Sequence, residues 1–420
     1  MTGSSLLLYI SIAIVLQVTL IGVASVLRAR TAVETDGVGS SATRVPASVA
    51  AWVGWREFRV TRRAYEDLNG SQCSFYFQPV DGAPLLAFKP GQFLTFQLQA
   101  GGTDAGRHDK TQTLIRCYSL SDRPATDHYR ITVKRLPTPL KLLGVAPGLA
   151  SNHFHDTVKI GDILRLRAPS GAFFVDPDPT HDLVLIAGGI GITPLLSMLL
   201  WCLDEQPQRS VHLYYGLRSS NEHVFKSQLA QLAVTHPRFR LTVAYSQPGP
   251  HDVSGQDFQH YGHVDLDLLK STLAHGHHQF YICGPAPMME SLVPALATWG
   301  VALADIHFEA FGSASIRTVN SSTEGSQPAA QDVAVQPFEV QFLQAGRTFL
   351  WTPTSGTLLD FAEKNGINVE SGCRAGSCGA CETKLISGSI RYADKPDYDV
   401  ATGHCLLCVG APSSDVVLVA

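Results

Sequence analysis

Two patterns of hydrophobic and polar positions divide the chain, and each predicts a different kind of β-strand. Residues 94–99 (LTFQLQ) and 129–134 (YRITVK) alternate apolar and polar side chains, as strands with one buried face do. Further short strands, separated by glycine and proline, continue through residues 52–176. This part of the chain therefore predicts an antiparallel β-barrel.

Residues 177–312 contain nearly continuous apolar strands instead. These strands lie at 182–187, 211–215, 241–245 and 280–283. Helical stretches at 194–203 and 222–232 alternate with them. Because solid apolar strands must be covered on both faces, this alternation predicts a parallel α/β sheet.

Near the amino terminus, residues 6–27 form an uncharged and almost wholly apolar run, long enough for one transmembrane helix. A cleaved signal peptide is the alternative, but it would need basic residues before the run. Residues 1–5 are uncharged, and Arg28 and Arg30 follow the run. We therefore expect an uncleaved single-pass anchor, with residues 28–51 as a linker and the rest of the chain facing the cytoplasm.

Composition narrows the class of protein. Of the 420 residues, 45% are hydrophobic and 16% are charged, against a usual charged share of about 25%, so large buried surfaces or a membrane segment are indicated. The formal net charge is -4 and no block of like charge occurs, which argues against a nucleic-acid partner.

The strongest chemical signal is a cysteine cluster in residues 337–420, which follow a Ser-, Gln- and Ala-rich linker at 313–336. Cys373, Cys378 and Cys381 have the spacing of plant-type [2Fe-2S] ligands. A structural zinc site is the alternative, but zinc usually takes two short, similar cysteine pairs, and this triplet is asymmetric.

The fourth cluster ligand is either Cys405 or Cys408. We favour Cys408, because it opens the segment Cys-Val-Gly and follows the strand residue Leu407. Cys405 is then expected to be a buried free thiol.

Four further motifs could belong to a binding site for a phosphate or a flat ring. Residues 116–119 (RCYS) place an arginine, an aromatic ring and a hydroxyl on one strand, although an ordinary barrel strand would look similar. Residues 148–152 (GLASN) form a turn of small residues before a short helix. Residues 188–194 (GGIGITP) follow an apolar strand and open a helix, the context of a phosphate-binding turn, and residues 283–288 (CGPAPM) end another strand.

In this order the motifs resemble the ferredoxin–NADP reductase superfamily, especially the reductase part of flavohaemoglobins and the NADH-dependent reductases of oxygenase systems. The resemblance covers residues 52–312. Residues 337–420 resemble plant-type ferredoxins, which implies a β-grasp fold. The implied protein has a membrane helix, an FAD-binding β-barrel, an NAD(P)-binding α/β domain and a C-terminal [2Fe-2S] domain.

The resemblance also implies roles for single residues. Arg116 would meet the FAD pyrophosphate, Tyr118 would stack on the flavin, and Ser119 would hydrogen-bond near its N5. Other residues assigned to FAD are Phe93, Cys117, Val133, Lys134, Gly148, Ser151 and Asn152. Those assigned to the dinucleotide are Gly188, Gly189, Ile190, Gly191, Ile192, Thr193, Cys283 and Gly284, with Phe311 and Gly312 covering the flavin.

A flavin between a nicotinamide and a [2Fe-2S] cluster can accept a hydride and release single electrons. We therefore expect transfer from NAD(P)H through FAD and the cluster to an external one-electron acceptor, such as an oxygenase, a haem protein or another redox protein. Arg218 would suit NADPH and Glu222 would suit NADH; the resemblance favours NADH.

Two other classes of protein stay open at this point. One is an electron carrier whose reductase region no longer turns over, which the intact motifs argue against. The other is a terminal oxygenase or nitric oxide-detoxifying enzyme. It is disfavoured because no globin precedes the reductase and no second metal-ligand set stands out.

Overall fold

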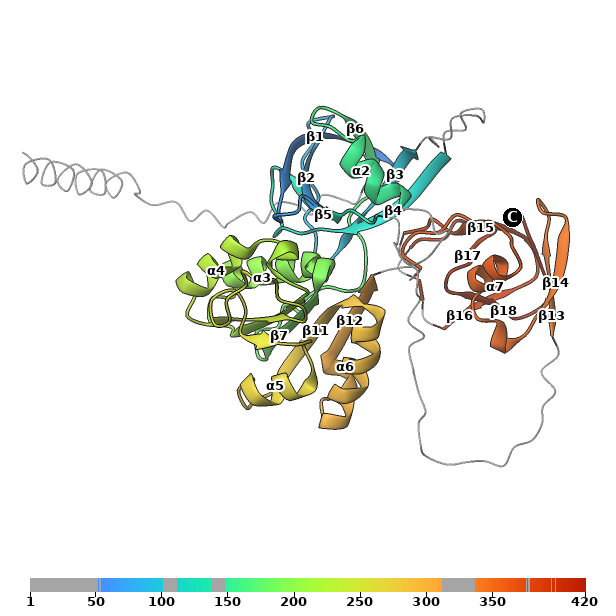
Figure 1. The fold of residues 1–420 in the computed structure, drawn as a ribbon. Helices are drawn as coiled ribbons and strands as arrows, with labels where there is room; N and C mark the ends of the chain where they lie inside the picture. The colour runs from blue at the N-terminus through green and yellow to red at the C-terminus, as the bar shows by residue number, and fades with distance from the viewer. Residues whose placement is uncertain are drawn as a thin grey trace, which may run out of the picture. The chain divides into compact units, whose positions relative to one another are not determined.

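The computed structural model describes residues 52, 54–100, 112–137, 148–311 and 337–420, except 375, 377, 394 and 397 (Figure 1). The predicted transmembrane helix at 6–27, the linkers at 28–51 and 313–336, and Gly312 lie outside the described residues. Within the described ranges, no helix is long and apolar enough to cross a bilayer.

The first sheet is antiparallel, as the alternating pattern predicts. Its order is β4-β3-β6-β1-β2-β5. The strands are β1 (Arg56–Tyr65), β2 (Gln72–Pro79), β3 (Phe93–Ala100), β4 (Gln112–Ser119), β5 (Tyr129–Lys134) and β6 (Ile163–Leu166). A bridge between Leu120 and Ile131 joins the two edges, so the sheet curls into a barrel. Helix α2 (Leu149–Asp156) fills one opening with Phe154, whose ring packs edge-on against Phe75 and Phe96.

The second sheet is parallel, in the order β10-β9-β8-β7-β11-β12. Its strands are β7 (Asp182–Gly188), β8 (Val211–Leu217), β9 (Phe239–Tyr245), β10 (His260–Tyr261), β11 (His278–Pro285) and β12 (Ile306–Phe311). The strand order reverses between β7 and β11. In open α/β sheets, ligands bind beyond the carboxyl ends of the strands at such a point.

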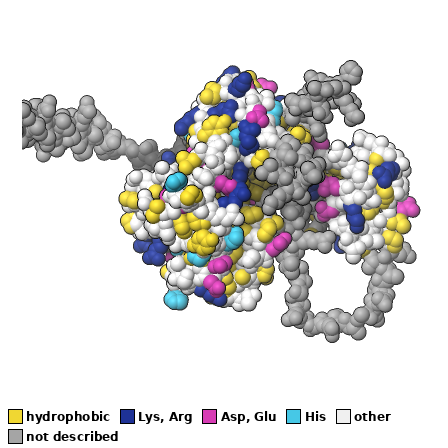
Figure 2. All heavy atoms as spheres, in the orientation of Figure 1, with side chains coloured by type: hydrophobic (Ala, Val, Ile, Leu, Met, Phe, Trp, Pro, Cys, Tyr) yellow, Lys and Arg dark blue, Asp and Glu magenta, His cyan; other side chains and the backbone are white. Residues whose placement is uncertain are grey.

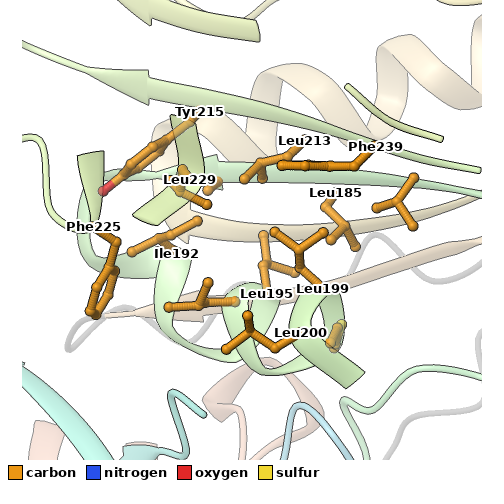
Figure 3. Packing of buried hydrophobic residues seen from close by; sticks show 14 of the residues in the cluster. Leu185, Ile192, Leu195, Leu199, Leu200, Leu213, Tyr215, Phe225, Leu229 and Phe239 are labelled. Atoms are coloured by element: carbon orange, nitrogen blue, oxygen red, sulfur yellow. The ribbon is translucent and has the colours of Figure 1, made fainter. Parts of the chain in front are cut away.

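Four helices cover this sheet: α3 (Ile192–Glu205), α4 (Lys226–Thr235), α5 (Leu266–Thr272) and α6 (Ala286–Trp299). One core contains Leu195 and Leu199 of α3 and Leu229 of α4, packed on Leu185 and Leu213 of the strands (Figure 3). A second core packs residues of α5 and α6 on the other face. The parallel, doubly covered sheet is therefore confirmed.

The helix predicted at 222–232 is wrong at its start. Glu222 ends a short 3-10 turn, Phe225 has a left-handed backbone (φ 58°), and α4 begins only at Lys226. Val224 and Phe225 are both buried in the first core. A residue with left-handed backbone cannot continue a right-handed helix, so the chain is not helical at Phe225 and α4 starts after it.

The last sheet is mixed, in the order β14-β13-β19-β15-β17, with β13 and β19 parallel. It comprises β13 (Phe338–Phe342), β14 (Arg347–Trp351), β15 (Glu382–Ser387), β17 (His404–Leu406) and β19 (Val416–Leu418), and β16 (Ile390–Tyr392) pairs separately with β18 (Gly410–Pro412). Helix α7 (Leu358–Lys364) packs on it, and Thr357 and Asp360 form a capping box at its start. A mixed sheet around one helix is the expected β-grasp arrangement.

Candidate redox sites

Strand β4 presents the RCYS residues on two opposite faces. Tyr118 packs edge-on against Phe96 and Phe154, with ring centroids 5.8 Å and 5.0 Å away, and burial raises the pKa of its phenol. Arg116 is exposed and donates to the carbonyl oxygen of Ile115, so most of its guanidinium is accessible to a phosphate. Because side chains alternate along a strand, Cys117 and the buried Ser119 lie on the other face.

The other residues predicted to meet the flavin have more varied positions. Phe93 is buried and packs with Ile115, Cys378 and Ala380. Val133 is buried, and its carbonyl oxygen accepts a hydrogen bond from Nε2 of His155.

Lys134 joins the barrel to the parallel sheet. Its Nζ lies 3.0 Å from Glu222 Oε2, and Arg218 forms an ion pair with the same carboxylate. Arg218, which would suit NADPH, and Glu222, which would suit NADH, are thus paired with each other.

The turn predicted at 148–152 is wrong in form, because Leu149–Asp156 is helix α2 and Gly148 is its N-cap. The Ser151 hydroxyl donates to the Gly148 carbonyl and accepts from the Leu136 amide, and Asn152 Nδ2 donates to the Leu136 carbonyl. These side chains fix the helix start. The first amides of an α-helix can still meet a phosphate, so the change of form leaves the anion-binding capacity in place.

The predicted dinucleotide turn connects β7 to α3 beside the end of β11. A Cβ on Gly188 would lie 2.7 Å from Pro285, and a Cβ on Gly191 would collide with the Cys283 carbonyl. Gly189 has φ +54° and open space around it. This turn is therefore a glycine-dependent cradle that leaves room for a ligand at Gly189.

Not every residue of that turn can reach a ligand with its side chain. Ile192 is wholly buried, and Thr193 is 2% exposed with its hydroxyl donating to the Ile190 carbonyl. Thr193 therefore shapes the turn, and any contact of it with a dinucleotide would come through the backbone.

At the end of β11, Cys283 is fully buried, and burial raises the pKa of its thiol. Cys283 pairs in register with Glu309 on β12, and Phe311 lies opposite Pro285 at the end of the same ladder. Gly284 is buried, and a Cβ there would lie 2.8 Å from Met288 Cε. Phe311 is half-buried against the first core.

Sequence reasoning missed Glu309 as a site residue. Its Oε2 is buried without a hydrogen-bond partner among the described residues. Burial, and then the charge at Cys373, raise the pKa of this carboxyl to about 8. A buried, unpaired carboxyl next to Cys283 is an orphaned polar group of the kind that a bound ligand satisfies. Its signal was the single charge in the last apolar strand.

The four predicted cluster ligands lie in one region and interact in pairs. Cys373 packs against the small buried group that contains Cys378, and Cys381 and Cys408 are both buried in the core of the ferredoxin-type domain. Backbone amides donate to two of the sulfurs: Cys373 N lies 3.2 Å from Cys378 Sγ, and Cys408 N lies 3.4 Å from Cys381 Sγ. Cys405 is buried on β17, opposite Thr383. This arrangement supports Cys408 as the fourth ligand.

Within the described part of the chain, no three His, Cys, Asp or Glu side chains already have metal-site spacing. The donor set nevertheless suits a [2Fe-2S] cluster, because three thiols come from one loop and the fourth, Cys408, follows β17 with its backbone amide donating to Cys381 Sγ. Amides also donate to Cys378 Sγ, and such hydrogen bonds tune the potential of a cluster.

Strand β4, the strand predicted to hold the flavin (the flavin strand), is in contact with the loop at residues 372–381 (the cluster loop). A small buried group combines Phe93 and Ile115 of the barrel with Cys378 and Ala380 of the loop, and Cys117 packs against it. The Cys117 thiol also lies 3.5 Å from the Thr95 hydroxyl of β3. Ile115 and Cys117 of β4 thus face the cluster loop, whereas Tyr118 packs against Phe96 and Phe154 on the opposite face.

Comparison with known proteins agrees with this division. Residues 185–293 match the family described as oxidoreductase NAD-binding domain, and residues 343–413 match the 2Fe-2S iron-sulfur cluster binding domain. The flavohemoprotein of Rhizobium meliloti (strain 1021) is 37% identical over 261 residues, which are 62% of this chain and 61% of that protein. The chain thus spans about three fifths of the length of the curated relatives it matches.

Solved structures extend the comparison. The flavohem-like FAD/NAD-binding domain of nitric oxide dioxygenase from Vibrio cholerae is 33% identical with a TM-score of 0.51, and the match covers 61% of this chain and 98% of that one. Phthalate dioxygenase reductase has a similar fold, at 24% identity and a TM-score of 0.50, covering 87% of this chain and 98% of that one. With FAD, a pyridine dinucleotide and a [2Fe-2S] cluster as its cofactors, the chain belongs to the ferredoxin–NADP reductase superfamily of oxidoreductases and carries a C-terminal ferredoxin-type domain.

Proposed function

We propose that this protein is a membrane-anchored NAD(P)H-dependent reductase that passes electrons through FAD and the [2Fe-2S] cluster to an external one-electron acceptor. The observation that carries the proposal is the contact between strand β4 and the cluster loop, in which Cys117 of β4 packs against the buried group that contains Cys378. A flavin supplies the conversion from hydride transfer to single-electron transfer. The chain's own residues position the two redox groups next to each other.

Residues around the dinucleotide turn support NAD(P)H as the electron donor. The glycines at 188 and 191 let β7 and β11 approach closely, and Gly189 leaves backbone accessible for a pyrophosphate. Cys283 is fully buried and Glu309 Oε2 is buried without a hydrogen-bond partner among the described residues, so this end of the sheet would shield a nicotinamide bound there from water.

The choice of NADH over NADPH is part of the proposal. The Glu222 carboxylate is held by Lys134 at 3.0 Å and is mostly buried, in a position to accept from a ribose hydroxyl. Arg218 is already paired with Glu222, which reduces its capacity to bind a 2′-phosphate.

The acceptor belongs to the class of one-electron redox proteins, such as an oxygenase or haem protein. Residues 337–420 contain nine Asp and Glu against six Lys and Arg, which could steer a basic partner. On the face of the molecule in Figure 2, acidic and basic side chains are interspersed over this domain. We therefore assign no partner to a particular surface.

The test is an anaerobic titration of the purified full chain with NADH and with NADPH, following the flavin and cluster absorbance bands separately. The proposal expects both bands to bleach, at lower concentration with NADH. A protein that binds the cluster but no flavin, and does not oxidise NAD(P)H, would be an electron carrier instead.

The anchor at residues 6–27 and its cytoplasmic orientation need a separate test. The full chain should stay with the membrane pellet after an alkaline wash, whereas a chain lacking residues 1–30 should be released. Protease added to intact cells should leave the reductase region uncut if it faces the cytoplasm.

A further inference from the structure

Arg167 of the barrel reaches into the cluster loop. It directly follows β6, and its Nη1 donates a 2.6 Å hydrogen bond to the carbonyl oxygen of Cys378. The guanidinium carbon lies 4.7 Å from the ring centre of Trp55 in the barrel and 5.4 Å from that of Tyr398 in the ferredoxin-type domain. One side chain thus makes a charge-assisted hydrogen bond and two cation–π contacts, one on each side of the interface.

The cluster loop is shaped to receive this arginine. Gly379 has φ +67°, and a Cβ there would lie 2.7 Å from Arg167 Nη1 and collide with the Tyr398 ring. Any larger residue would push the guanidinium away from the Cys378 carbonyl. Glycine at position 379 therefore permits both the left-handed turn of the loop and the close approach of Arg167.

Arg167 is also tied to the flavin strand. Its backbone amide donates to the carbonyl oxygen of Thr95 on β3, and Thr95 pairs in register with Cys117 on β4. Cys117 in turn packs against the buried group that contains Cys378 and Ala380. Arg167 and Cys117 therefore meet the cluster loop at two neighbouring points of the barrel.

We propose that Arg167 is a positioning residue that holds the cluster loop on the flavin strand and thereby sets the rate at which single electrons leave the reduced flavin for the oxidised cluster. No bond forms or breaks at Arg167. The inference rests on the proposed function, because it assumes that the flavin reduces the cluster within this chain.

The variants are Arg167→Ala and Arg167→Lys in the full chain, with Arg165→Ala as the matched control. Arg165 lies two residues earlier, has an exposed side chain, and hydrogen-bonds Gln97 within the barrel. Arg167→Ala and Arg165→Ala each remove one positive charge from the same edge of the barrel. Lysine keeps the charge but loses the planar fork, so it separates charge from geometry.

Stopped-flow spectroscopy should show flavin reduction by NADH at the wild-type rate and cluster reduction slowed about tenfold or more in Arg167→Ala, which is the size of a lost hydrogen bond to a charged donor. Arg167→Lys should be intermediate, and Arg165→Ala should match the wild type. The cluster potential, measured by redox titration, should change too little to account for the slower rate.

A second readout does not depend on activity. Cys117 is covered by the cluster loop, so iodoacetamide labelling of Cys117, followed by peptide mass spectrometry, should increase in Arg167→Ala and stay unchanged in Arg165→Ala. Unchanged cluster reduction, unchanged labelling, or a potential shift that explains the rate would each overturn the role of Arg167. If the wild-type flavin bleaches with NADH and the cluster never does, the proposed function itself fails.

Discussion

The buried carboxyl of Glu309 makes a prediction about pH and stability. Its pKa is raised from the usual 4.5 to about 8, by burial first and by the charge at Cys373 second. Between these values the folded protein keeps the proton and the unfolded chain has released it. The contribution of Glu309 to the free energy of unfolding therefore falls as the pH rises from 4.5 to about 8, and it stays constant at higher pH.

The size of this effect follows from the two pKa values. The unfolded chain ionises Glu309 at a lower pH than the folded protein does. The free energy of unfolding therefore falls by on the order of 5 kcal/mol as the pH rises to about 8. Glu309→Gln cannot ionise, so the variant should not show this loss. The buried amide of Glu309→Gln destabilises the variant by the same amount at every pH. The test therefore compares the stability difference between variant and wild type at two pH values.

Thermal unfolding of the holoprotein, followed by circular dichroism at about pH 5 and about pH 9, measures that difference. The Tm of Glu309→Gln relative to the wild type should rise by up to about 10 °C between the two conditions. Glu290→Gln is the control, because Glu290 is an exposed residue of α6. A difference between Glu309→Gln and the wild type that is the same at both pH values would refute the reasoning.

Three further changes test the other sites. Gly191→Ala places a Cβ against the Cys283 carbonyl, and we expect a loss on the order of 3 kcal/mol in urea unfolding together with weaker NADH binding by titration. Cys408→Ala should remove the visible cluster absorbance and the bound iron, while Cys405→Ala should retain both; the reverse result would exchange the two assignments. Ser119→Ala should keep FAD bound but slow flavin reduction in stopped-flow by about tenfold, and an unchanged rate would count against its role.

Features encoded by nearby residues could be predicted from the sequence. The alternation at 129–134 coincides with β5, and the apolar run at 182–187 falls within β7, because the local pattern indicates a strand. The one exposed face that alternation implies is absent from β5, since Arg130 and Thr132 are buried too. The cysteine spacing likewise identified the cluster loop, since its first three ligands lie within nine residues. These signals need no knowledge of the tertiary fold.

Features that depend on distant residues could not be predicted. Arg167 and Cys378 are 211 positions apart, and nothing near Arg167 in the sequence marks it as different from Arg165. The start of α4 was missed because the burial of Val224 and Phe225 depends on packing against the parallel sheet. The state of Glu309 depends on what covers β12, which the strand's own sequence does not contain.

The register of β4 against β3 decides which redox group each side chain can reach. The pairing runs from Phe93 with Ser119 to Ala100 with Gln112, and the bridge after β4 fixes the strand end on β5. A slip of one residue would turn Tyr118 toward the cluster loop and Cys117 into the barrel core. A substitution that disturbs this pairing should therefore impair flavin binding and cluster docking together, whereas one at Arg167 should impair docking alone. That difference separates a defect in the strand from a defect in the contact it supports.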